Sequence, residues 1–306
     1  MSAEAGAAVA LRGVAKHYGA VHAVDGVDLD VQRGEVFGLI GHNGAGKSTL
    51  FKMMLGLVSP SAGDIRIQGA PVSGRGFRDV RRGIGYLPEN VVLYDNLDGL
   101  ETLRFFARLK GAPLADCEAA LQRVGLNGAG RRPVREYSKG MRQRLGFAQA
   151  LLGAPQVLFL DEPTNGLDPE AIRDFYATLH QLRDEGTTIV ITSHILAELQ
   201  ERVDRLAILA AGRVRALGSV QSLRERMSLP LRLRVQVAEG GAAALQAAVA
   251  GLPLAEARWQ GHELQADCPR EAKMRVLAAL SGLGAQVRDI QVVEPSLEDL
   301  FFGVAA

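Results

Sequence analysis

A glycine-rich segment at residues 41–48 carries the residue types needed to hold a polyphosphate. It fits the pattern G-x-x-x-x-G-K-[ST] at every fixed position and reads Gly41, His42, Asn43, Gly44, Ala45, Gly46, Lys47 and Ser48. Its glycines let successive backbone N–H groups turn inward around phosphate oxygens, where side chains would block the approach. We expect Lys47 to contact the β- and γ-phosphates of a nucleoside triphosphate, Ser48 to ligate Mg²⁺ and Thr49 to add a phosphate contact.

Two acids end an apolar run further along the chain. Residues 157–160 read Val-Leu-Phe-Leu, and Asp161 and Glu162 follow them. An isolated pair of acids after a strand is more often a solvated loop. This pair follows a phosphate-binding segment in the chain and precedes Pro-Thr-Asn-Gly-Leu-Asp-Pro at residues 163–169. We therefore expect Asp161 to hold Mg²⁺ through water and Glu162 to polarise the attacking water.

A histidine lies directly after another apolar run. His194 follows residues 189–193, where the carboxyl end of a strand would lie, and ligands of open α/β sheets bind at such ends. A lone histidine after a strand is usually structural. Beside the segments above, a neutral His194 imidazole is predicted to hydrogen-bond the γ-phosphate and to orient the water.

The elements that position these residues alternate between strand-like and helical patterns from Val9 to about Leu217. Apolar strands are expected at residues 35–40, 156–160 and 187–192, and a helix is expected from Lys47. Strands separated by helices favour an α/β fold with a mostly parallel sheet flanked by helices. Between about residues 90 and 150 the pattern becomes helical, with one helix beginning at Pro113, which indicates a helical insert.

The pattern of predicted strands and helices changes near residue 220, so we expect a domain at residues 1–220 and an accessory domain at residues 221–306. The second part shows strand and helix patterns in the order β-α-β-β-α-β, which indicates a small ferredoxin-like α+β domain. A last short helix is expected from the capping residue Ser296, with Leu297, Leu300 and Phe301 packing inward.

The amino-acid composition makes some classes of function and partner less probable. The 306 residues include 35 Lys and Arg against 34 Asp and Glu, a net charge of +1, so a nucleic-acid partner is not expected. Cys117 and Cys268 match no metal or redox spacing. The first residues lack the basic start of a signal peptide, and no apolar run reaches the ~18 residues of a membrane helix. Any membrane spans would therefore come from a partner.

Residues 137–144 carry the most specific resemblance. They read Tyr-Ser-Lys-Gly-Met-Arg-Gln-Arg, and with the segments above they make the chain similar to the ATP-binding subunits of ABC transporters over about Val9 to Leu217. The resemblance implies a P-loop NTPase fold with an antiparallel β subdomain, and ATP and Mg²⁺ as cofactors. It also implies a head-to-tail homodimer with two ATP molecules, in which a serine-capped helix meets the γ-phosphate held by the other copy. The residues implied to make that contact are Ser138, Lys139, Gly140 and Met141.

Single residues also resemble functional residues of the family, and three residues depart from the family's commonest pattern. Tyr18 resembles the residue that stacks on adenine, although a packing tyrosine is the alternative, and Asp168 resembles a residue that signals across the dimer. Lys139 and Met141 replace glycine and glutamine. Glu89 replaces the usual glutamine that contacts Mg²⁺; a carboxylate suits a cation but lies near Glu162 and adds repulsion.

Both kinds of departure occur in ATPases that serve export-type permeases, and residues 294–301 resemble the C-terminal ending of that branch. Residues 89–91, 101–111 and 149–153 are similar to the ATPase subunit of the transporter for copper-site maturation of nitrous oxide reductase. That resemblance implies an integral membrane permease, a possible periplasmic partner, and a peripheral location on the cytoplasmic face of the inner membrane.

Other functions stay open at this stage. Within transport, the alternative is the ATPase of a drug or lipid exporter. Outside transport, the alternatives are an ATPase acting on ribosomes or DNA, and a nucleotide-dependent dimerising regulator that does not hydrolyse ATP. Near-neutral charge weighs against the first of these two, and the Glu162 and His194 pair weighs against the second.

Overall fold

A computed structural model describes residues 6–74, 76–226 and 230–293. The chain divides into two compact units, Met1–Val220 and Gln221–Ala306. None of the helices in the described part of the chain combines the length and apolar character that crossing a bilayer requires. The helix expected from Ser296 and the ending at residues 294–301 lie outside the described residues.

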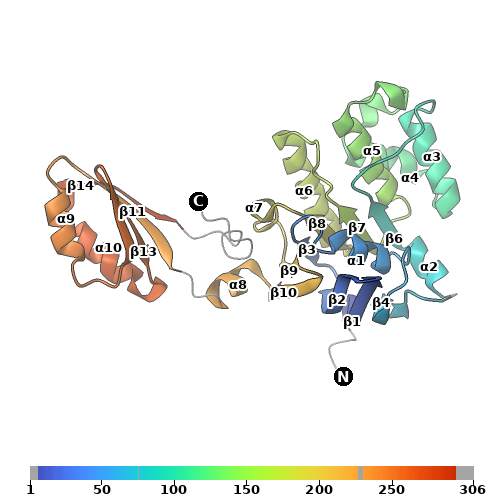
Figure 1. Ribbon diagram of the computed structural model, residues 1–306. Helices are drawn as coiled ribbons and strands as arrows, with labels where there is room; N and C mark the ends of the chain where they lie inside the picture. The colour runs from blue at the N-terminus through green and yellow to red at the C-terminus, as the bar shows by residue number, and fades with distance from the viewer. Residues whose placement is uncertain (1–5, 75, 227–229, 294–306) are drawn as a thin grey trace. The chain divides into compact units, whose positions relative to one another are not determined.

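A six-stranded sheet forms the centre of the first unit (Figure 1), with strand order β10-β9-β3-β8-β7-β6. The strands are β3 Val36–Ile40, β6 Ile84–Leu87, β7 Val157–Asp161, β8 Thr188–Ser193, β9 Arg205–Ala210 and β10 Arg213–Gly218. All pairs are parallel except β9 with β10. Every residue of β3, β7 and β8 is buried, as the continuous apolar runs predict for a sheet covered on both faces. The predicted α/β core is confirmed.

A second sheet is antiparallel, with order β2-β1-β4-β5. Its strands are β1 Ala7–Tyr18, β2 Val21–Gln32, β4 Ala62–Ile67 and β5 Ala70–Pro71. Val27, Leu29 and Val31 of β2 point into a core that also contains Leu50, Phe51 and other residues of helix α1, Lys47–Met54. This sheet is the predicted antiparallel β subdomain.

Helices cover the central sheet and form the insert. They are α2 Phe77–Arg82, α3 Gly99–Lys110, α4 Asp116–Arg123, α5 Lys139–Leu151, α6 Pro169–Asp184 and α7 Leu196–Leu199. Asp98 caps α3 in a capping box with Glu101. The prediction that a helix begins at Pro113 is wrong by three residues: the Asp116 N–H donates to the Pro113 carbonyl in a turn, and α4 begins after it.

The second unit is an antiparallel sheet of order β12-β13-β11-β14 with two helices. In chain order, after α8 Val220–Arg226, its elements are β11 Leu231–Val237, α9 Ala242–Val249, β12 Ala255–Gln260, β13 Glu263–Cys268, α10 Lys273–Ser281 and β14 Val287–Val293. The apolar positions of β11 alternate inward and pack with Val276 and Leu280 of α10. This is the predicted ferredoxin-like order.

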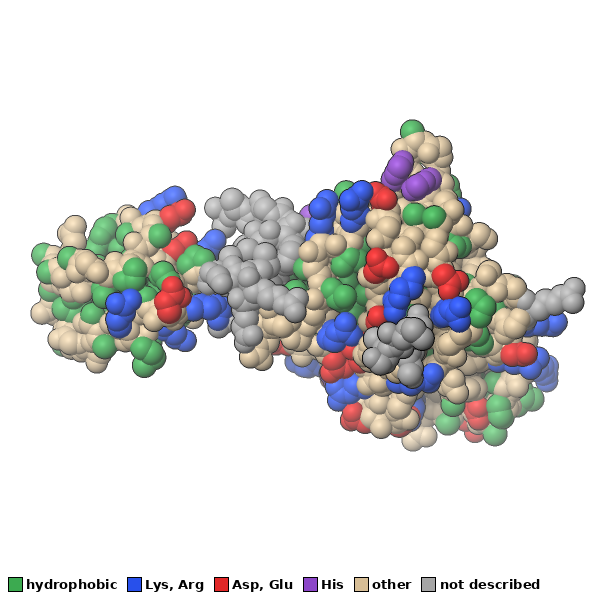
Figure 2. Space-filling model, turned by 90° about the horizontal axis from the view of Figure 1, so that it is seen from below, with side chains coloured by type: hydrophobic (Ala, Val, Ile, Leu, Met, Phe, Trp, Pro, Cys, Tyr) green, Lys and Arg blue, Asp and Glu red, His purple; other side chains and the backbone are tan. Residues whose placement is uncertain are grey.

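Charged side chains of both signs lie on one face of the molecule. On the face shown in Figure 2, Lys and Arg side chains are interspersed with Asp and Glu side chains, as the near-equal numbers of the two kinds imply.

Candidate nucleotide-binding site

The segment at residues 41–46 links β3 to α1 by a turn that only glycine allows at key positions. Gly44 and Gly46 have φ angles of +82° and +105°. A Cβ on Gly46 would lie 2.4 Å from the Ala23 carbonyl oxygen, and one on Gly41 would lie 2.4 Å from the Leu209 carbonyl oxygen. Neighbouring backbone therefore presses on the turn from outside. The turn curls ahead of the first N–H groups of α1, which is the form of an anion cradle.

Lys47 is buried at the start of α1 and points back into this turn. Its Nζ donates to the Gly41 carbonyl oxygen at 2.5 Å and lies 3.5 Å from Glu162 Oε1. A buried ammonium needs such partners to offset its lost hydration. The turn and the carboxylate thus hold the cation at the centre of the cradle, where phosphate oxygens could replace the carboxylate as its partner.

Asp161 and Glu162 are fixed by one hydroxyl on the neighbouring strand. The Thr192 hydroxyl donates to Asp161 Oδ1 at 2.7 Å and accepts from the Glu162 N–H at 2.9 Å. Glu162 has a φ angle of +47°, an uncommon conformation for a side chain other than glycine. Such strain persists where the surroundings dictate it, often at functional positions. The turn redirects Glu162 from the buried strand toward Lys47.

Burial shapes the electrostatics of this edge. Desolvation raises the pKa of Asp161, and the negative charge of Glu162 adds to the rise, whereas the Thr192 hydrogen bond and Lys47 act against it. Burial also raises the pKa of Tyr86 to about 12, with contributions from Asp161 and Glu89. Acidic charge therefore accumulates at this edge, which makes it a favourable place for a cation.

His194 completes the group. Its Nδ1 lies 2.8 Å from Glu162 Oε2. An ionised carboxylate can only accept, so Nδ1 carries the proton and Nε2 is left as an acceptor in the neutral ring. Glu162 thus contacts both a cation and an imidazole, while His194 is half exposed toward the open side. A carboxylate placed in this way can take a proton from a water molecule.

These residues line one cavity of about 510 Å³, a volume typical of small-molecule sites. Eleven of the predicted residues line it: Tyr18, His42, Asn43, Gly44, Gly46, Lys47, Ser48, Thr49, Glu89, Glu162 and His194. Gly41 and Ala45 lie in the same turn, and Asp161 lies buried beside Glu162. Asn165, within the Pro-Thr-Asn-Gly-Leu-Asp-Pro run, also lines the cavity, although its residue type and position predict no role for it.

Several residues of the site were missed. Val21, His22 and Ala23 line the cavity from the β1–β2 pair, and Ala211 and Gly212 line it from the β9–β10 turn. Thr192 was hidden in an apolar strand, where a buried hydroxyl was the only signal. Nothing local to residues 21–23 or 211–212 marks them, because their place depends on how distant strands pack.

The serine-led segment lies apart from the cavity. Ser138 caps α5 by accepting from the Met141 N–H at 3.2 Å, and both Ser138 and Lys139 are exposed. The Lys139 side chain packs over Gly166, and Gly140 is beside Leu167. Asp168 caps α6 by accepting from the Ala171 N–H at 2.8 Å. None of these residues is among the described residues that line the cavity around Lys47 and Glu162.

Comparisons with known proteins agree on one family. Residues 24–165 match the family model described as "ABC transporter". The chain is 38% identical over 302 residues to the daunorubicin resistance ATP-binding protein DrrA3 of Streptomyces coeruleorubidus, covering 96% of this chain and 94% of that protein. It is 37% identical over 292 residues to the human phospholipid-transporting ATPase ABCA7, covering 91% of this chain but only 14% of that protein.

Among solved structures, one described as the ATP binding subunit of an ABC transporter is similar, with a TM-score of 0.66 and 33% identity. The match covers 72% of this chain and 92% of that one.

Proposed function

The chain belongs to the ATP-binding, ATP-hydrolysing subunits of ABC transporters, and from this premise we propose that two copies enclose two ATP molecules head to tail and power a separate membrane permease. Cassettes of this family form dimers and work with membrane permease components. The single observation that carries the proposal is the division of the site: a cradle with its own base, and an exposed serine-capped helix that does not line the cavity formed by the described residues of the cradle.

In the cradle, the chain's residues divide the work. Residues 41–46 and Thr49 bind the phosphates through their N–H groups and hydroxyl, with Lys47 neutralising the β- and γ-phosphates. Tyr18 offers an exposed ring for stacking on the base. Glu162 accepts the proton of the attacking water, and His194 holds Glu162 and faces the γ-phosphate.

The residues present suit Mg²⁺, which prefers oxygen ligands. Ser48 and Glu89 line the cavity, and Asp161 lies beside it at the strand end. When bound, the ion neutralises charge that develops on the phosphates.

Ser138, Lys139, Gly140 and Met141 would meet the γ-phosphate held by the other copy, where the helix N-terminus favours negative charge. The Lys139 side chain packs on Gly166, two residues before Asp168. A movement of Lys139 when it meets the other copy's nucleotide would therefore be passed to Asp168. Hydrolysis removes the contact that joins the two copies and lets them separate. The helical insert and the segment around Glu89 would pass this movement to the permease.

For the cargo, the segments at residues 89–91, 101–111 and 149–153 favour the nitrous oxide reductase system, in which the transporter serves copper-site maturation. On this proposal the permease works with a periplasmic partner, and the chain lies on the cytoplasmic face of the inner membrane. A second candidate is export of a drug or lipid, which the names of the daunorubicin-resistance and phospholipid-transporting relatives favour.

Isolation of the full-length chain from detergent-solubilised membranes tests the proposal. With ATP and Mg²⁺ present, we expect a two-copy assembly and a co-purifying protein with several membrane spans. Removal of the gene then separates the cargo candidates: reduced copper content of nitrous oxide reductase favours the first, and greater drug sensitivity or an altered lipid composition favours the second. A chain that stays a single copy with ATP and brings down no membrane protein would contradict the proposal.

A further inference from the structure

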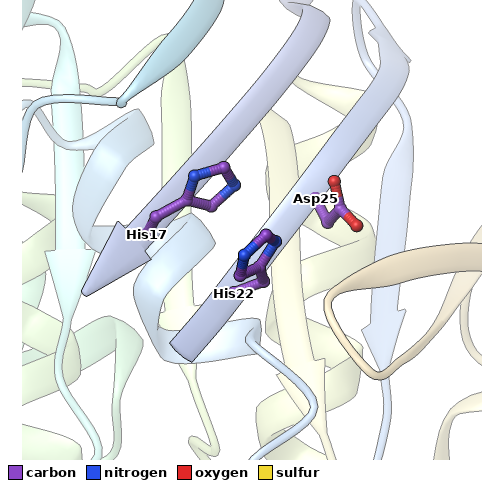
Figure 3. A group of neighbouring side chains, drawn as sticks. All are labelled: His17, His22 and Asp25. Carbon is purple, nitrogen blue, oxygen red and sulfur yellow. The ribbon is translucent and has the colours of Figure 1, made fainter. Parts of the chain in front are cut away.

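Two histidines and an aspartate lie together at the hairpin end of β1 and β2. His17 and His22 are partners across the strands, and their rings stack with centroids 4.0 Å apart and an interplanar angle of 27°. Ligand atoms of His17, His22 and Asp25 all lie within 4.8 Å of one another. Figure 3 shows the two rings beside each other on neighbouring strands, with the Asp25 carboxylate on the same strand as His22. None of the three has a role in the proposed hydrolysis.

A β-bulge explains why these three side chains converge. His17 pairs with His22, but Lys16 pairs with Val24, so β2 carries one extra residue, Ala23, at this point. An extra residue shifts the alternation of side chains by one, which allows Asp25 to share a face with His22 although it lies three positions on. Ala23 is also the residue whose carbonyl oxygen presses on Gly46. The bulged residue thus lies directly against the nucleotide cradle.

The donor atoms are available. Both imidazoles are exposed, and Asp25 is half buried. Arg213 donates from Nε at 3.0 Å and from Nη2 at 2.7 Å, in both cases to Asp25 Oδ2, so Oδ1 is the oxygen available for ligation. A ligating carboxylate held by a second group in this way is usual at metal sites.

The backbone around the cluster is anchored at both strands. The His17 N–H donates to Ser61 Oγ at 3.1 Å, and the Asp25 N–H donates to the Gly212 carbonyl oxygen at 2.9 Å. The donors lie within 4.8 Å of one another, and side-chain rotation would have to bring them to the separation of about 3.4 Å that a tetrahedral ion with ligand distances near 2.1 Å requires. The exposed imidazoles have room for that rotation.

We propose that His17, His22 and Asp25 bind one divalent transition-metal ion. Two imidazoles with one carboxylate select ions of the zinc, copper and nickel class over Mg²⁺ and Ca²⁺, which prefer oxygen ligands. Three protein ligands leave at least one position for water or another donor. The ion would tie the ends of β1 and β2 together beside Tyr18 and Val21, at the rim of the nucleotide cavity.

Titration of the full-length protein with Zn²⁺ in excess Mg²⁺ tests the site by calorimetry. We expect one site per chain, with an affinity that His17→Gln and His22→Gln each lower by at least about tenfold. His262→Gln is the matched control, because His262 is also exposed but lies in the second unit. His194→Gln removes another imidazole of the nucleotide cavity and is likewise expected to retain the site.

Zn²⁺-dependent change in the melting temperature gives a second readout for the same variants, because an ion that binds only the folded chain stabilises it. Circular dichroism and a separate ATP titration show whether each variant is folded and keeps its nucleotide site, so failure of the metal site is distinct from failure of the proposed function. Absence of one-to-one Zn²⁺ binding would overturn the proposal. An affinity that His17→Gln and His22→Gln leave unchanged, or that His262→Gln lowers equally, would do the same.

Discussion

The two halves of the proposed ATP site are built in opposite ways. The cradle half is buried and cross-linked within one chain: Lys47 and Glu162 lie 3.5 Å apart, and Thr192 holds both strand-end acids. The serine-led half is exposed, and the Ser138 side chain accepts a hydrogen bond from the Met141 N–H of its own helix.

This difference indicates what each half needs. Buried charges must be positioned before the nucleotide arrives, because moving them during reaction would cost reorganisation energy. An exposed helix N-terminus needs only an anion to approach it. The cradle half can therefore be positioned within one copy, whereas the serine-led half would bind an anion only when another copy brings its nucleotide.

Removal of the base should have the largest effect on the cradle half. We expect Glu162→Gln to lower ATP turnover roughly 10²–10⁴-fold, because the amide cannot take a proton from water, while ATP binding is retained. Phosphate release at saturating ATP and a nucleotide titration measure the two effects separately. Glu239→Gln, an exposed change in the second unit, serves as the control. Near-normal phosphate release from Glu162→Gln would remove Glu162 from the role of base.

Mixing experiments test whether the halves come from different copies. Lys47→Ala should weaken ATP binding about 10–100-fold, because it removes a charged partner of the phosphates, and Lys52→Ala on the exposed side of the same helix should not. Ser138→Arg should block the other half. Each variant alone then has two defective sites.

A mixed pair of Lys47→Ala and Ser138→Arg chains collects both defects in one site and leaves the other intact. We expect mixing to restore up to half of the wild-type turnover per pair, measured on tagged heterodimers. Heterodimers with no more activity than either variant alone would contradict the head-to-tail arrangement, since a site within one copy would stay defective in both chains.

Residues that are contiguous or lie at strand ends could be predicted from the sequence, whereas residues whose role depends on strand pairing could not. The cradle was predictable because Gly41 to Ser48 are contiguous and their spacing is set by phosphate geometry. Glu162 and His194 were predictable because the carboxyl ends of parallel strands meet at one edge. Thr192 was not, because its role depends on the pairing of β7 with β8, and a threonine is ordinary in a strand.

The hairpin edge was hidden for a different reason. His17, His22 and Asp25 converge because Ala23 forms a bulge, and the bulged residue lies against Gly46, which belongs to another segment of the chain. A regular strand would place His22 and Asp25 on opposite faces. Helix α4 shows the smaller error of a boundary: Pro113 suits a first helical turn, but here it starts the turn that precedes the helix.

The smallest expected effect concerns stability, and the two halves should respond with opposite signs. Burial raises the pKa of Asp161, so the folded chain favours the protonated acid, and ionisation at neutral pH costs stability. Asp161→Asn should therefore raise the free energy of unfolding by about 1 kcal/mol at neutral pH, because it keeps an acceptor for Thr192 without the charge. Ser138→Ala should lower it by about 1 kcal/mol through loss of the helix cap.

The sign can be checked by changing pH. Because the pKa of Asp161 is raised by folding, the contribution of this acid to the free energy of unfolding is fully present at low pH. It is lost as the pH rises through the folded-state pKa of Asp161. The advantage of Asp161→Asn should therefore be present at pH 7 and shrink as the pH falls and the wild-type carboxyl becomes protonated. Thermal unfolding of both proteins at several pH values measures this, with the exposed change Asp174→Asn as control. If Asp161→Asn is less stable than the wild type at pH 7, then the buried acid stabilises the cradle in the absence of nucleotide, and the cost assigned to preparing this half of the site does not exist.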